Sequence, residues 1–267
     1  MQKQTIRIVL IVLAVISFIG SILVPGIHSD VSLSEAMKDA VVHKVEKIDL
    51  FGFIQVNPAV ISAFIVSGVL ILFAIIVRIF VIPKFKRVPG KFQLLLEQAV
   101  TSFRNLAKDN SPHRHGFLGL YVFVAGVYIA FSTLFELSGI QVITGTGESI
   151  SLPAPLSDLN GAISMAILSF LTILSGGIIS NGIRGVGKTL KEFSLPISMS
   201  FRLFGALVSG LLVTDLVYHT IFLSYGIPVI VAILFTLLHA VIQAYVLTLL
   251  TSIFYGEVSE VSEKHLN

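Results

Sequence analysis

Six long runs of apolar residues, separated by shorter polar segments, organise this chain. The runs cover residues 8–24, 59–77, 116–135, 159–183, 195–214 and 228–255. A membrane-spanning helix needs about 20 mostly apolar residues, so the last five runs are long enough and the first is borderline. This pattern predicts an all-α integral membrane protein with about five to six membrane helices. Gly226 and Pro228 form the only strong turn signal between the last two runs, which predicts a long antiparallel C-terminal helical hairpin.

Two of the polar segments have patterns of their own. Between Gly90 and Asp109, apolar residues recur at helical spacing among charged ones, which predicts an amphipathic helix at the membrane interface. Its apolar positions are Phe92, Leu95, Leu96, Ala99, Phe103 and Leu106. Residues 29–47 mix charges with valines and indicate an amphipathic or loosely ordered segment outside the membrane.

The composition agrees with a membrane location and excludes several kinds of site. Of the 267 residues, 55% are hydrophobic and 12% are charged, whereas soluble domains carry about 25% charged residues. The chain has no cysteine, which excludes disulfides, thiolate nucleophiles and cysteine metal ligands. It also lacks an H-E-x-x-H motif, and His113 and His115 alone are a weak metal pair. We therefore expect no cofactor, no metal and no protease active site.

Lysine and arginine are unevenly distributed among the polar segments. They are frequent in residues 78–116 and 184–192, whereas residues 141–158 contain neither. The positive-inside rule therefore places the first two segments in the cytoplasm and the third outside. Lys3 and Arg7 precede the first apolar run, which is either an uncleaved membrane helix, the interpretation we favour, or a removed signal peptide.

Arg202 stands inside the fifth apolar run. The next ionisable side chain after it is Asp215, and residues 216–256 contain no Asp, Glu, Lys or Arg. A guanidinium within hydrocarbon costs roughly several kcal/mol, so an intramembrane arginine is a candidate for handling charge inside the membrane. Arg202 lies about 12 Å into its run at 1.5 Å per residue, so snorkelling of the side chain to the interface is the structural alternative.

The residues around Arg202 resemble subunit a of the membrane sector of F-type ATP synthases. Residues 194–210, SLPISMSFRLFGALVSG, contain the P-x-S-x-x-x-R-L-F-G pattern of that family. Residues 242–251 resemble its last helix, residues 88–110 its V-P-G…K-D-N loop, and residues 155–160 the turn before its fourth helix. These four matches occur in the right order and cover roughly residues 45–256.

The resemblance implies a function and a set of partners. The chain would be the stator ion-channel subunit of a rotary ATP synthase, with two half-channels and an essential arginine for ion transfer to and from the rotating c-ring. It would serve ATP synthesis and proton transport without being an enzyme by itself. Its partners would be the c-subunit ring, the peripheral-stalk b subunits, other ATP synthase subunits and membrane lipid, with no nucleic acid. It would be a multi-pass protein of the bacterial plasma or inner membrane. A stand-alone polytopic ion channel or transporter is the alternative.

The resemblance also assigns roles to individual residues. Arg202 would be the essential intramembrane cation, and Gln243 would lie on the facing helix and orient it. The family's usual half-channel side chains are absent, because Ala206, Leu211 and Thr236 stand in their places.

Titratable residues stand one helical turn from two of these positions. Asp215 is at i+4 from Leu211, and His239 is at i+3 from Thr236, so each keeps its helix face. We expect Asp215 and His239 to form the external half-channel, and Glu136 either lines its outer vestibule or is a surface carboxylate.

The predicted organisation has three parts. Residues 1–58 form an N-terminal membrane or signal-like helix and an external segment. Residues 59–256 form the membrane ion-translocating domain. Residues 257–267 form a short cytoplasmic tail.

Overall fold

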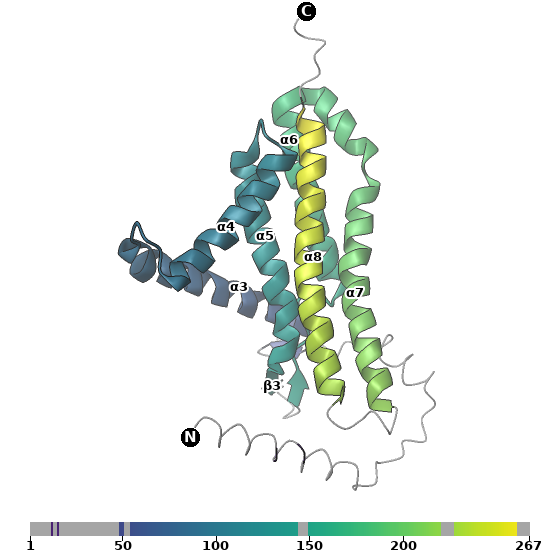
Figure 1. Ribbon diagram of the computed structural model, residues 1–267. Helices are drawn as coiled ribbons and strands as arrows, with labels where there is room; N and C mark the ends of the chain where they lie inside the picture. The colour runs from purple at the N-terminus through teal and green to yellow at the C-terminus, as the bar shows by residue number, and fades with distance from the viewer. Residues whose placement is uncertain are drawn as a thin grey trace, which may run out of the picture. The chain divides into compact units, whose positions relative to one another are not determined.

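A computed structural model describes residues 48–50, 54–143, 149–219 and 227–260, together with Val12 and Val15. Six helices account for most of the described chain (Figure 1). They are α3 (Pro58–Ile76), α4 (Lys91–Asn110), α5 (His115–Leu134), α6 (Leu159–Lys191), α7 (Ser194–His219) and α8 (Ile227–Ser259). The chain divides into two compact units, residues 1–44 with 208–235, and residues 45–207 with 236–267. The packing described below lies within the second unit.

The predicted all-α membrane class is confirmed. Four helices in the described part of the chain are long and apolar enough to cross a membrane. They are Pro58–Lys84, His115–Ser138, Leu159–Lys191 and Val229–Ser259, which correspond to the second, third, fourth and sixth apolar runs. The fifth run lies in α7, several of whose side chains are outside the described part, and most of the first run is outside it too.

Two short β-hairpins were not predicted from the sequence. Strand β1 (Ile48–Leu50) pairs antiparallel with β2 (Ile54–Val56), and β3 (Gln141–Ile143) pairs antiparallel with β4 (Ser149–Ser151). Each strand has three residues. Such short strands leave too few alternating positions for a period of two to be recognised in the sequence.

The first turns of α3 and α6 are joined by their capping residues. The Asn57 side chain accepts a hydrogen bond from the Ala59 backbone NH, while Asp158 Oδ1 accepts from Asn160 and Gly161. Asn57 Nδ2 also donates to Asp158 Oδ2 over 2.7 Å. Each cap satisfies otherwise unpaired NH groups of its own helix, so this pair holds two helix starts side by side. Asp158 thus serves as the N-cap of α6.

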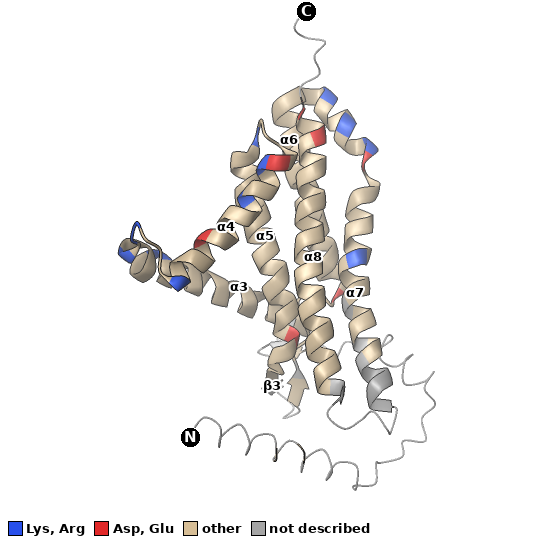
Figure 2. Cartoon of the chain, viewed as in Figure 1, with Lys and Arg blue, Asp and Glu red and all other residues tan. Residues whose placement is uncertain are grey.

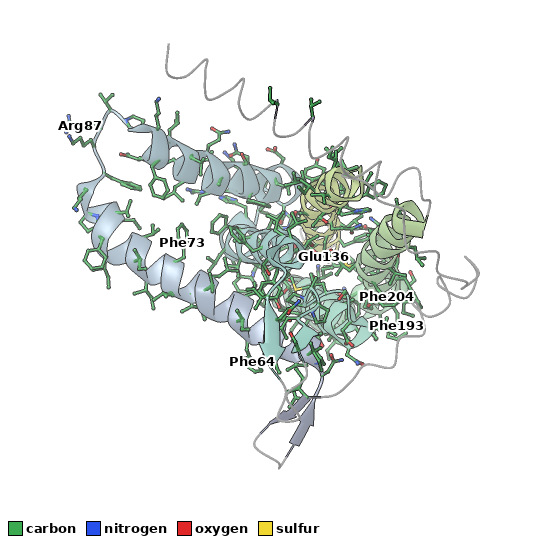
Figure 3. All side chains as sticks on the ribbon, turned by 90° about the horizontal axis from the view of Figure 1, so that it is seen from below. Phe64, Phe73, Arg87, Glu136, Phe193 and Phe204 are labelled. Carbon is green, nitrogen blue, oxygen red and sulfur yellow. The ribbon has the colours of Figure 1, made fainter. Side chains whose placement is uncertain are left out.

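The predicted amphipathic helix is α4, and it packs against α5. A Cβ added at Gly126 of α5 would lie 2.5 Å from Phe103 of α4, so only glycine lets the Phe103 ring approach this closely. Phe103 also contacts Phe123 edge to face, with ring centroids 5.9 Å apart. Figure 3 shows α3 with Phe64 and Phe73, and Arg87 at the far tip of the connection between α3 and α4.

Two clusters of buried apolar side chains hold α5, α6, α7 and α8 together. The first joins Ala125 and Ile129 of α5 to Met165 of α6, Leu203 of α7 and Leu247 of α8. The second joins side chains of α4, α5, α6, α7 and α8, namely Ala107, Leu118, Val122, Ile173, Leu195, Tyr255 and Val258. The first half of α7 therefore packs against the other helices on one side, the side that carries Leu195, Met199 and Leu203.

Helix α6 breaks at Gly182 and folds back on itself. Gly182 has φ 56° and ψ −134°, a conformation that is essentially restricted to glycine. After this break, the Gly185 backbone lies directly against the Gly177 carbonyl, and Thr189 Oγ1 donates to the Gly185 carbonyl over 2.9 Å. The segment 183–191 then leads into α7, so the break sets where α7 begins.

Charged residues are unevenly distributed over the second unit (Figure 2). Lys and Arg mark the connection between α3 and α4, the helix α4, and the final part of α6. The hairpin of β3 and β4 follows the opposite end of α5. This segregation supports the predicted orientation, in which the basic ends face the cytoplasm.

The orientation is testable with single cysteines, because the chain has none of its own. A cysteine replacing Gly145 should react with an impermeant maleimide in intact cells. A cysteine replacing Gly187 should react only after permeabilisation. Labelling of the Gly187→Cys variant in sealed cells would contradict the predicted orientation.

Candidate ion-translocation site

Arg202 lies on the exposed side of the first half of α7. Met199 and Leu203, three residues before and one residue after it, are each 2% exposed and belong to the first core cluster, whereas Arg202 is exposed. The Arg202 side chain makes no hydrogen bond or ion pair with another described residue. The fold therefore anchors the helix on one side and leaves the guanidinium available to a partner on the other.

The start of α7 is rigidly seated. Leu195 is 8% exposed, and Ser200 Oγ donates to the Pro196 carbonyl over 2.6 Å, which satisfies a hydroxyl that would otherwise be buried unpaired. Just before the helix, the Phe193 ring meets Phe170 of α6 edge to face at 6.5 Å. These contacts fix the height of Arg202 along the helix bundle.

Gln243 is the second predicted site residue, and it is buried. It lies on α8 with a relative exposure of 7%, and its Oε1 atom has no hydrogen-bond partner within the described structure. The next residue, Ala244, belongs to the same core cluster as Leu203 of α7. The structure thus places Arg202 and Gln243 on two helices that share one core, without a direct hydrogen bond between them in the described residues.

His239 stands one helical turn before Gln243 on α8. It is half-buried and has an interaction partner in the structure. Thr236, which occupies one of the positions where the family usually has a titratable residue, is 7% exposed. Since i and i+4 residues lie on one helix face, His239 and Gln243 line the same side of α8.

Glu136 lies in the short 3₁₀-helix Phe135–Ser138 that ends α5. Its side chain is half-buried, and Figure 3 shows it close to the middle of the helix bundle, far from Arg87. Whether Glu136 lines a vestibule or is a surface charge stays a prediction.

Asp215 lies within α7, but its side chain is outside the described residues. Its relation to His239 therefore stays a prediction.

The two loop histidines, His113 and His115, each make a hydrogen bond. His113 Nε2 pairs with Ser259 Oγ at 2.8 Å, and His115 Nδ1 pairs with the Pro112 carbonyl at 2.9 Å. In the described part of the chain, no group of three or more His, Asp or Glu side chains is arranged to hold a metal ion.

Sequence reasoning missed two residues of this region. Asn57 was not singled out, although an Asn-Pro pair before an apolar run is a helix-start signal. Ser132 was also missed. It is 0% exposed, its Oγ has no hydrogen-bond partner within the described structure, and Glu136 follows one turn later.

A comparison with known protein families identifies the family to which this chain is similar. The family model described as ATP synthase A chain matches residues 60–256. The match runs from the first turn of α3 to the last turn of α8, and it includes Arg202, Gln243 and the whole membrane bundle. Because the match covers most of the chain, the protein belongs to the ATP synthase A chain family, the Fo subunit a of ATP synthesis and proton transport.

Proposed function

We propose that this chain is the stator subunit that supplies two ion half-channels and an essential arginine to a rotary ATP synthase. The observation that carries the proposal is the placement of Arg202, which is exposed on a helix whose neighbouring residues Met199 and Leu203 are buried. A permanent charge held rigidly in an apolar helix, with an open side, is suited to meet the membrane carboxylates of a passing ring.

The chemistry follows from the guanidinium. Arginine stays protonated at any pH that a protein experiences, so its charge does not depend on burial. A fixed cation near a carboxyl group favours the ionised carboxylate, so each ring carboxyl would release its ion on approaching Arg202. The same charge would repel cations and prevent direct passage between the two half-channels. A lysine would be less suitable, because burial lowers the pKa of an amine readily.

Gln243 would orient the arginine. A buried amide oxygen needs a donor, and a guanidinium offers five N–H groups. The side chain of Gln243 lies on the helix that shares the core cluster with α7, so a hydrogen bond from Arg202 would satisfy Oε1 when the side chain turns inward. This contact would hold the guanidinium in one position between passing ring subunits.

The apolar outer surfaces support partners within the membrane. Helix α3 exposes many large apolar side chains, including Phe64 at 75% and Ile71 at 60%. Beside it lies a cavity of about 760 Å³ between α3, α4 and α5, lined mainly by apolar side chains such as Leu70, Phe73 and Val127. Such surfaces suit lipid and the membrane helices of the peripheral-stalk b subunits and other ATP synthase subunits. We place the complex in the bacterial plasma or inner membrane.

The competing proposal is a stand-alone ion channel or transporter. The two are separated by ATP-driven ion pumping in the reconstituted complex, with and without Arg202. A stand-alone channel would conduct ions when purified by itself and would not need a ring of small hairpin proteins. In the proposal favoured here, the chain is no enzyme by itself, and it co-purifies with that ring.

Asp215 and His239 are proposed to replace the displaced half-channel groups. The support is that each stands one turn from a position where the family usually has a titratable residue, and that His239 is four residues before Gln243 in α8, which is the spacing of one helix face. If both serve one access path, Asp215→Asn and His239→Ala should each slow ion pumping by roughly 10²-fold, the lower end for loss of a proton-transferring group. Assembly of the complex should be unchanged.

A variant that moves both titratable groups back to the family's usual positions tests the same access path. Leu211→Glu with Thr236→His, in an Asp215→Asn and His239→Ala background, returns the titratable groups to the family's usual positions and should restore part of the pumping rate. Unchanged rates in both single variants would show that other groups form the path.

A further inference from the structure

The chain from the end of α3 to the start of α4 is strongly basic, and we call residues 78–91 the basic connection. Between Asp49 and Glu97 the sequence contains no acidic residue. Figure 3 places Arg87 at the tip where α3 and α4 meet, away from the helix bundle. The exposed cations of this connection are Arg78, Lys84, Lys86, Arg87 and Lys91. The connection therefore presents a local excess of positive charge.

Gln93, in the first turn of α4, holds the backbone of the basic connection in place. Its Oε1 atom accepts a hydrogen bond from the Lys86 backbone NH over 3.1 Å, and its Nε2 atom donates to the Lys86 carbonyl over 3.0 Å. The preceding residues Ile82–Lys84 form a 3₁₀ turn that contains Pro83. Both bonds of Gln93 are to the main chain, so the backbone is fixed while the Lys86 side chain stays exposed.

An apolar cavity begins directly beside these cations. The cavity of about 760 Å³ between α3, α4 and α5 is lined by Phe85, and Lys84 and Lys86 flank this residue in the sequence. Along α3 the lining runs from residue 67 to residue 77, which is about 15 Å of helix. The hydrocarbon core of a bilayer is about 30 Å thick, so the cavity is about as long as one leaflet is deep.

One charged residue, Glu97, is among the residues that line the cavity. Its Oε1 atom accepts a hydrogen bond from Gln93 Nε2 over 2.7 Å, so the carboxylate is engaged by the same side chain that holds the connection. The five cations of the basic connection outnumber this single carboxylate. The charge around the cavity is therefore suited to an anion.

We propose that this cavity binds an anionic phospholipid of the cytoplasmic leaflet, with an acyl chain between α3, α4 and α5 and the phosphate at Lys84, Lys86 and Arg87. The candidate membrane span that contains α3 ends at Lys84, so these cations stand at the level of the lipid headgroups. Basic pockets at the cytoplasmic ends of membrane helices bind anionic headgroups, and Lys and Arg form charge-assisted hydrogen bonds with phosphate.

The charges favour a lipid over a membrane helix of another subunit. An apolar helix would fill the cavity but would not neutralise the cations beside it, whereas an anionic lipid does both. The site needs the basic connection to face the cytoplasm, as the distribution of Lys and Arg predicts. It goes beyond the proposed stator function and does not depend on the role of Arg202.

The occupant is tested with a photoreactive lipid. The full complex is reconstituted in phosphatidylcholine vesicles that contain a minor amount of phosphatidylglycerol with a photoreactive acyl chain. After illumination, the adducts are located by mass spectrometry. We expect them within residues 67–77 and 123–128, which line the cavity, and only few when phosphatidylcholine carries the same chain. Equal labelling by the two lipids, or labelling by neither, would overturn the proposal.

The headgroup contact is tested by removing two charges. Lys84→Gln with Lys86→Gln should lower the phosphatidylglycerol adducts by about fivefold for each lysine, the factor that corresponds to one basic residue near anionic lipid. The bonds from Gln93 to the Lys86 backbone remain possible in this variant. Lys108→Gln with Lys191→Gln is the matched control, because it removes two exposed charges away from the cavity. An equal fall in both double variants would mean general attraction to the surface and no site.

The acyl-chain contact is tested by filling the cavity. Ala74 lies in the middle of the lining face of α3, with Leu70 and Val77 one turn away on either side. Ala74→Trp should lower the phosphatidylglycerol adducts to the level of the phosphatidylcholine probe. Ile75→Trp is the control, since Ile75 is exposed on α3 but does not line the cavity. Unchanged adducts in Ala74→Trp, or loss of another subunit from that complex in place of lipid, would contradict the proposal.

The lipid site and the stator function fail separately. Absence of lipid adducts removes the lipid site and leaves the role of Arg202 intact. Normal pumping by a complex that lacks Arg202 removes the stator assignment, and the adducts at the cavity would remain as evidence of the lipid.

Discussion

Replacing Arg202 with alanine is expected to abolish ATP-driven ion pumping while the complex remains assembled. The side chain is exposed on α7 and makes no hydrogen bond or ion pair to another described residue, so its loss breaks no polar contact that holds the described helices together. A substitution on an exposed helix position away from packed contacts changes stability by about 0.5 kcal/mol or less. The defect should therefore appear in transport and not in the yield of the purified complex.

Arg202→Lys is the more demanding variant. It keeps the positive charge in water but loses the planar fork of donors, and burial readily removes the proton of an amine. We expect at most a small residual rate from this variant. The measurement is quenching of a pH-sensitive dye in vesicles that carry the reconstituted complex, with rotation-coupled ATP hydrolysis recorded in parallel. Normal pumping by either variant would contradict the stator assignment. A complex that fails to assemble in both would assign Arg202 a structural role instead.

Replacing Gly185 with valine is expected to have the largest effect on folding. The Gly185 backbone lies directly against the Gly177 carbonyl after the break at Gly182, so an added side chain would meet backbone atoms and not a flexible neighbour. Overpacking costs about 1–3 kcal/mol and occasionally more, and a backbone contact belongs to the upper part of that range. The fold-back of segment 183–191 sets where α7 begins, so this variant should lose both yield and pumping.

The matched control is two residues away. Gly187→Val is on the same segment, and an added Cβ there meets no atom within 4 Å. The readout is the fraction of detergent-solubilised protein that remains monodisperse after stepwise heating. We expect the control to behave like the parent chain and Gly185→Val to aggregate at a clearly lower temperature. Equal behaviour of the two variants would show that the close contact at Gly177 does not support the fold.

Several features of the protein were determined by the sequence alone. Apolar runs of membrane length predicted the helices found at α3, α5, α6 and α8, and the helical spacing of residues 90–109 predicted α4. These features are local, because the hydrophobic period and the length of a run depend only on neighbouring residues. Arg202 was also identified from sequence, since a charge inside an apolar run is visible without any tertiary contact.

The tertiary structure decided which of these residues meet. The α5–α8 register follows from the contact between Gly126 and Thr248, and no local pattern in either helix specifies it. That register sets which levels of α5 and α8 meet, although the two helices are far apart along the chain. The side of α7 that is buried likewise depends on how Met199 and Leu203 pack into the shared core, which leaves Arg202 on the open side. Helix periodicity predicts faces, but only packing between helices decides which face meets which partner.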